Sequence, residues 1–106
     1  MRAAILLTAL AVVMLTGPAK ANFKSGNQLL QECSTPGADQ ICLGYIQGIV
    51  DAETDMARTC LPGSVTPGQA RDIAIKLLDD HPELRHYTAS SLVTRALAEA
   101  FPCRFR

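Results

Sequence analysis

Four cysteines, at positions 33, 42, 60 and 103, constrain what this chain folds into more than any other feature. All of them follow a segment that is typical of a signal peptide: a basic start, an uncharged apolar run and a small-residue cleavage motif that ends at Ala21. The apolar run is shorter than the roughly 18 residues of a membrane-spanning helix. We therefore expect residues 1–21 to be a signal peptide and residues 22–106 to form one exported domain.

A domain of about 85 residues has a small hydrophobic core, and domains of this size often need covalent support. An even number of cysteines in an exported domain predicts two disulfides. Zinc is the alternative, but the cysteines are too far apart in the sequence to include a close Cys-x-x-Cys pair. We therefore expect a disulfide-linked domain without a metal.

Residues 40–60 are predicted to form the central helix of the domain. Apolar side chains recur there at steps of three and four, which is typical of one helical face: Ile41, Tyr45, Ile49, Ala52 and Met56. A second apolar row lies beside the first: Cys42, Ile46 and Val50. Gly44 and Gly48 form a smooth ridge, which we expect to face a neighbouring helix at close range. Gly48→Leu should then overpack this contact by about 1–3 kcal/mol.

Three further helices are predicted around the central one, over residues 23–33, 66–80 and 88–101. The first two begin with the spacing of a capping box, formed by Ser25 with Gln28 and by Thr66 with Gln69. Asp39 is well placed to cap the central helix. Because no strand pattern is present in the sequence, the predicted fold class is all-α, a small four-helix bundle linked by disulfides.

Helix topology selects one of the three ways to pair four cysteines. Cys42 and Cys60 would lie about 27 Å apart at the two ends of a continuous central helix, whereas a disulfide spans no more than roughly 7 Å between Cα atoms. Short loops make neighbouring helices antiparallel, which brings Cys33 to Cys42 and Cys103 to Cys60. We expect these two disulfides. From the entropy of loop closure they contribute about 2.7 and about 4 kcal/mol, respectively.

The polar residues do not form a catalytic or metal-binding constellation. The acidic and histidine side chains between Asp79 and His86 lack an HExxH spacing, and Ser90 and Ser91 fit helix capping without a base at a known spacing. Three carboxylates of the central helix fan across its polar side, as on a solvated face: Asp51, Glu53 and Asp55. We expect no enzymatic activity and no cofactor. Basic and acidic residues are nearly balanced, so we also expect no nucleic-acid partner.

A series of short motifs follows in a definite order along the chain. It begins with Ser25-Gly26-Asn27-Gln28-Leu29-Leu30-x-x-Cys33 and continues with Cys42-x-Gly44-Tyr45-Ile46-x-Gly48-x-x-Asp51-Ala52. Cys60-x-Pro62, Val65-Thr66-x-x-Gln69, His81-Pro82-Glu83 and Ala96-Leu97-x-x-Ala100-Phe101-Pro102-Cys103 come next. With these landmarks the chain resembles the Rap/Tai family of small periplasmic immunity proteins over nearly all of residues 22–106.

The resemblance implies a periplasmic protein that binds and neutralises a peptidoglycan-cleaving amidase effector of type VI secretion. It also implies a homodimer, and no membrane partner is expected after cleavage. The partner should meet surface groups that the fold does not need, and our candidates are Asp51, Glu53, Asp55, Arg58, Leu61, Pro62, Gly63, Ser64 and Val65. Two alternatives remain open: a periplasmic acid-stress chaperone, whose pH switch would depend on two histidines and ten carboxylates, or another small helical binding protein.

Overall fold

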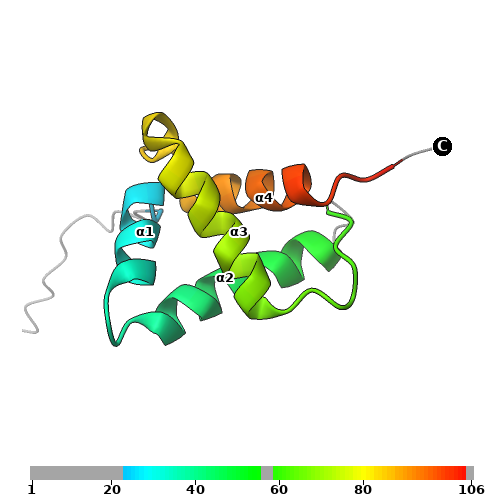
Figure 1. Cartoon of the computed structure of the whole chain (residues 1–106), viewed down its shortest axis with the longest axis horizontal. Helices are drawn as coiled ribbons and strands as arrows, with labels where there is room; N and C mark the ends of the chain where they lie inside the picture. Colours follow the sequence, from blue (N-terminus) through cyan, green and yellow to red (C-terminus); the bar gives the residue numbers. More distant parts are fainter. Residues whose placement is uncertain (1–22, 56–58, 105–106) are drawn as a thin grey trace, which may run out of the picture.

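A computed structural model describes residues 23–55 and 59–104 of the protein (Figure 1). Within these ranges the chain forms four α-helices: α1 (Gly26–Ser34), α2 (Asp39–Asp55), α3 (Pro67–Asp80) and α4 (Ala89–Ala100). A single 3-10 turn, η1 (Pro82–Leu84), lies between α3 and α4. No β-strand occurs in the described part of the chain, and the predicted all-α fold is confirmed. None of the helices described is long and apolar enough to cross a membrane.

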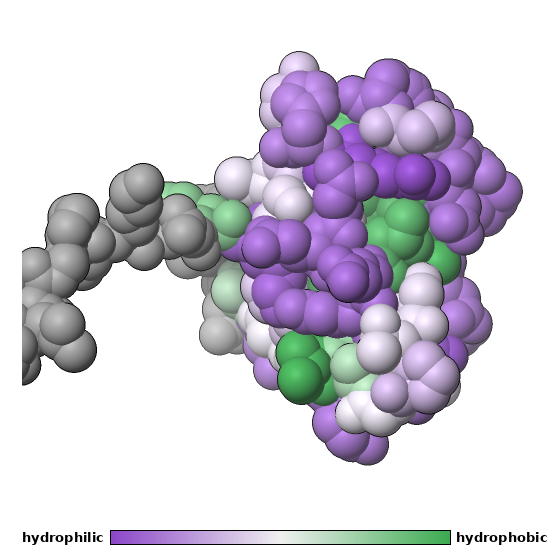
Figure 2. All heavy atoms as spheres, turned by 90° about the vertical axis from the view of Figure 1, so that its left-hand side faces the viewer, coloured by the Kyte–Doolittle hydropathy of each residue, from purple (hydrophilic) through white to green (hydrophobic). Residues whose placement is uncertain are grey.

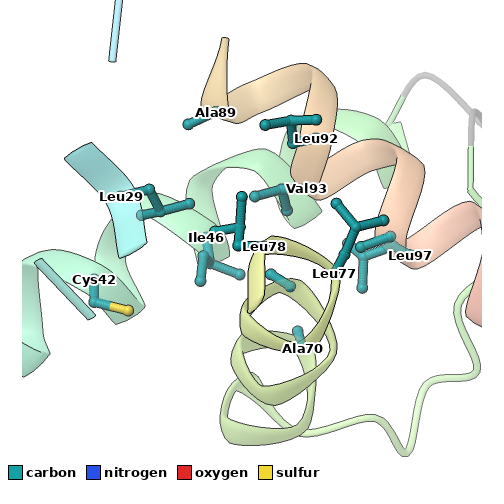
Figure 3. Close-up of a cluster of buried hydrophobic side chains, with 12 residues drawn as sticks. Leu29, Cys42, Ile46, Ala70, Leu77, Leu78, Ala89, Leu92, Val93 and Leu97 are labelled. Carbon is teal, nitrogen blue, oxygen red and sulfur yellow. The ribbon is translucent and has the colours of Figure 1, made fainter. Parts of the chain in front are cut away.

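The four helices enclose one hydrophobic core, and every pair of them is in contact. α3 lies across α2 and α4 (Figure 1). Each helix places a fully buried side chain in the centre of the core, where these four gather (Figure 3): Leu29, Ile46, Leu78 and Val93. Because burial of one such side chain contributes about 1.5–3 kcal/mol, this small core is the main source of stability.

Local hydrogen bonds fix where two of the helices begin. The Ser25 hydroxyl accepts a hydrogen bond from the Gln28 N–H (3.2 Å), and the Gln28 side chain accepts one from the Ser25 N–H (2.8 Å). Thr66 and Gln69 repeat this reciprocal pair at α3, at 3.1 and 2.8 Å, so that both predicted capping boxes are confirmed. Asp39 is the first residue of α2 rather than its cap, and there its charge is favourable near the positive end of the helix dipole.

The central helix is shorter than predicted from residues 40–60. α2 ends at Asp55, and the described residues Thr59 and Cys60 are outside any helix. Met56, which was expected on the apolar face, lies outside the described residues. The apolar periodicity therefore did not predict that Thr59 and Cys60 lie outside the helix.

The expected glycine ridge of α2 is wrong. A Cβ atom built on Gly44 or on Gly48 meets no described atom of a neighbouring element within 4 Å, so both glycines lie on an open face. The row that contains Cys42 and Ile46 is the buried one, while Ile41 remains 57% exposed. The prediction that Gly48→Leu overpacks a helix contact is therefore wrong, because no described atom of a neighbouring helix lies close to Gly48.

The close approach that a glycine makes possible occurs instead at Gly26, at the start of α1. A Cβ atom there would lie 2.6 Å from Leu92 Cδ1 and 3.0 Å from the carbonyl oxygen of Arg85. The N–H of Gly26 donates to the Tyr87 carbonyl, and the N–H of Asn27 donates to the Arg85 carbonyl, both at 2.9 Å. The start of α1 is therefore joined by backbone hydrogen bonds to the segment that leads into α4.

Both predicted disulfides are present, with Cα–Cα distances of 5.0 Å for Cys33–Cys42 and 5.1 Å for Cys60–Cys103. Their surroundings differ. Cys42 is fully buried, and its disulfide joins the last turn of α1 to the first turn of α2. Cys60 is exposed, and its disulfide joins two segments that lie outside the helices. The first disulfide is thus part of the core, and the second lies at its edge.

We predict that Gly26→Ala lowers the free energy of unfolding by about 1–3 kcal/mol, because the added methyl group overpacks against Leu92 and the Arg85 carbonyl. Gly48→Ala is the matched control and should raise this free energy by about 0.5–1 kcal/mol, because alanine is favoured in an open helix interior. Urea denaturation measures both changes. Stabilisation by Gly26→Ala would contradict the close approach.

Because the two disulfides differ in burial, we predict that serine and alanine substitutions differ in their stability cost at Cys33–Cys42 but not at Cys60–Cys103. Replacing Cys33 and Cys42 by serine should cost about 1–3 kcal/mol more than replacing them by alanine, because the fully buried position 42 would hold an unpaired hydroxyl. For Cys60 and Cys103 the two kinds of substitution should agree within about 0.5 kcal/mol. Urea denaturation of the four double variants compares them, and equal costs at Cys42 would contradict its burial.

Candidate partner-binding surface

The candidate contact residues lie where α2 ends and where the chain leads into α3, at the end of the molecule away from α1 (Figure 1). Asp51 and Glu53 are in the last turns of α2, and Asp55 is its final residue. Arg58 lies outside the described residues. Residues 61–65 form the loop before α3.

Asp51 and Glu53 of α2 do not share one solvated side. Asp51 is exposed, and the Gln47 side chain donates a hydrogen bond to it at 3.0 Å. Glu53 is half-buried and turns toward α4, where it lines a hollow of about 340 Å³ with three hydroxyl side chains: Ser90, Ser91 and Thr94. Glu53 therefore does not lie on the exposed side of α2 that carries Asp51.

The loop of residues 61–65 is folded into a tight turn. The Val65 N–H donates to the Pro62 carbonyl at 3.1 Å, which leaves Pro62, Gly63 and Ser64 exposed at the tip. Leu61 is half-buried and packs against the hydrophobic core, and this contact anchors the loop. A loop that is ordered before it meets a partner loses little conformational entropy on binding.

Thr59 is a residue in this region that no sequence pattern singles out. Its side chain is 8% exposed, and its hydroxyl has no hydrogen-bond partner among the described residues. A buried hydroxyl without a partner costs about 1–3 kcal/mol. Thr59 stays buried because the next two residues are held, Cys60 by its disulfide and Leu61 by the core. The segment is thus kept in place against a local energetic penalty.

The other clusters of polar side chains in the described residues give no support to a metal site or a pH switch. In the described part of the chain, no three side chains of the kinds that bind metals come together. On the open side of α3, a hydrogen bond of 2.8 Å from Lys76 lowers the pKa of Asp80, and the same bond raises the pKa of Lys76. The stability from this pair is lost as the pH falls through the lowered pKa of Asp80. Because both groups are exposed, that contribution is small and gives no support to an acid-activated switch.

The opposite end of the molecule, on the α1 side, is mainly polar. Figure 2 shows hydrophilic residues over most of this face, with small and separate hydrophobic areas between them. Across the described residues, the most exposed large apolar side chains are those of Phe23, Ile41 and Tyr87. A broad apolar patch, which often marks a protein–protein interface, is not visible among the described residues on this face.

A family model described as Rap1a immunity proteins matches residues 25–103 of the chain. No curated protein and no solved structure matches the chain. The matched range begins at Ser25, the cap of α1, and ends at Cys103, the last cysteine of the second disulfide. The unit that the family shares therefore coincides with the four helices and both disulfides.

We predict that Thr59→Val raises the free energy of unfolding by about 1 kcal/mol, because valine has a similar shape and lacks the unpaired hydroxyl. Thr59→Ser keeps the hydroxyl and removes a buried methyl group, so it should lower this free energy by about 1 kcal/mol. Urea denaturation tests the pair of variants. A loss of stability in the valine variant would mean that the Thr59 hydroxyl is paired.

Proposed function

Because the chain belongs to the family of Rap1a immunity proteins, we propose that it binds and neutralises a peptidoglycan amidase effector of type VI secretion in the periplasm. The family match over residues 25–103 is the observation that carries this proposal. Membership of an immunity family also fits a protein that is not an enzyme. Two disulfides in so small a domain support an oxidising compartment, and in this proposal residues 1–21 direct export and are then removed.

The proposed mechanism is occlusion of the effector's active site. We place the contact on Asp51 and Asp55 and on the exposed turn at Pro62, Gly63 and Ser64. The ordered turn supports entry into a cleft at low entropic cost, and the carboxylates supply charge that favours a basic rim and speeds association. No chemical step is required of this chain, because an active site that is covered cannot admit its substrate.

The proposal includes the homodimer that the resemblance implies. Size-exclusion chromatography with light scattering measures the mass of the mature protein in solution directly. A mass of one protomer at the concentrations of the binding experiment would remove the homodimer and leave the effector contact unaffected.

We predict that co-expression of the exported protein with a genetically linked amidase prevents periplasmic lysis. Charge reversal by Asp51→Lys with Asp55→Lys should weaken binding on the order of tenfold without lowering stability, because both groups lie on the proposed contact. Asp72→Lys is the matched control, an exposed carboxylate on α3 whose reversal should leave binding unchanged. Calorimetry gives the affinities, and urea denaturation gives the stabilities.

Two different results would contradict two parts of this proposal. Full rescue and unchanged affinity in the Asp51 and Asp55 double variant would remove the proposed contact surface. Failure of the wild-type protein to bind any genetically linked secreted amidase would remove the immunity function itself.

A further inference from the structure

We infer that the Cys60–Cys103 disulfide is a redox-sensitive clamp, whose reduction releases residues 59–65 while the four-helix core remains folded. The clamp itself is argued from the structure of this chain alone. Its consequence for effector binding rests on the proposed function.

The two disulfides differ in their access to a reductant. Exchange requires a thiolate to reach one of the two sulfur atoms. Cys60 is exposed, and Cys103 and Cys33 are half-buried. Cys42 is fully buried and belongs to the cluster of core side chains (Figure 3). The exposed sulfur-bearing residue belongs to the second disulfide, so an external thiol meets Cys60–Cys103 before Cys33–Cys42.

The two disulfides also differ in what they hold. Cys33 and Cys42 lie inside α1 and α2, so their bond joins two core helices. Cys60 lies after α2 and Cys103 follows the end of α4, so their bond joins segments outside the helices. The helices α2, α3 and α4 keep their mutual packing through buried side chains when the second bond is cut.

The described residues make few other contacts that hold residues 59–65 in place. Within the described part of the chain, the backbone hydrogen bond of this segment is internal, from the Val65 N–H to the Pro62 carbonyl. Leu61 packs against the core and so favours the position in which residues 59–65 lie against it. Thr59 opposes it, because its buried hydroxyl has no partner among the described residues and would gain hydrogen bonds from water on release. The disulfide therefore determines whether residues 59–65 stay packed against the core or are released.

The chemical step is ordinary thiol–disulfide exchange with a dithiol reductant. One reductant thiolate attacks the Cys60 sulfur, the Cys60–Cys103 bond breaks, and the Cys103 thiolate leaves and takes up a proton. The second reductant thiol then attacks the mixed disulfide and frees Cys60, which is also protonated. The protein gains two electrons and two protons, and the dithiol becomes a disulfide.

The consequence concerns the exposed turn at Pro62, Gly63 and Ser64. Its position depends on anchors at both ends, Cys60 on one side and the capped start of α3 at Thr66 on the other. Loss of the Cys60 anchor leaves Leu61 alone to hold that side of the turn. The turn then becomes more mobile, so that binding must order it again at an entropic cost. Effector binding would therefore depend on the oxidised state of this one disulfide.

The test is stepwise reduction of the mature protein with dithiothreitol, followed by alkylation and mass spectrometry. Cys60 and Cys103 should be alkylated on the order of tenfold faster than Cys33 and Cys42. Limited proteolysis should then cut the chain within residues 59–65, with the helical circular dichroism signal retained. Earlier or simultaneous alkylation of Cys33 and Cys42 would overturn the clamp, and so would loss of helical signal together with the first alkylation.

Variants separate the clamp from general destabilisation. In the reduced protein, Thr59→Val should be cleaved within residues 59–65 more slowly than wild type, because release no longer frees a buried hydroxyl. Cys60→Ser with Cys103→Ser should retain the helical signal and lose on the order of tenfold in affinity for a linked amidase that wild type binds. Unchanged affinity would overturn the functional part. If wild type binds no amidase, the proposed function fails, and the order of alkylation still decides the clamp.

Discussion

The close approach at Gly26 is the contact on which the arrangement of this domain depends. Only a residue without a side chain lets the start of α1 lie against Leu92 and the Arg85 carbonyl. Once this point is fixed, Leu29 and Cys33 follow on the same side of α1 at steps of three and four. Leu29 then enters the core, and Cys33 reaches Cys42 in α2. One backbone contact thereby orients α1 along its whole length.

The sequence predicts those parts of the fold that depend on local chemistry or on connectivity. Both capping boxes were predicted because Ser25 and Thr66 act on residues only three positions away. The disulfide pairing was predicted correctly although α2 ends before Cys60, because antiparallel connections bring helix ends together whatever the helix length. The buried row of α2 was not predictable from periodicity, since both rows are apolar. The link from Cys42 to Cys33 turns that row inward and leaves Ile41 outside.

The candidate surface was predictable only in outline. Two residues along a helix correspond to about 200° of rotation, so the separation of Asp51 from Glu53 follows from helix geometry once α2 is known. Thr59 carries no such signal, because its burial results from the attachment of its neighbours Cys60 and Leu61 to distant parts of the chain. The family match covers the elements that build the fold, whereas a contact surface also depends on the shape of its partner, which this chain does not encode.

The joining of α1 to the segment before α4 also bears on the order in which the chain folds. A protein is synthesised from its N-terminus, so the residues of α1 are made long before the groups that contact its first turn. These groups are the Leu92 side chain and the carbonyls of Arg85 and Tyr87. Contacts between residues so far apart form late and slow the search for the native state. Cys33 and Cys42 are close enough in sequence to pair early, whereas Cys60 can form its disulfide only after Cys103 has been made. The domain therefore acquires its native topology only after nearly all of its residues have been made.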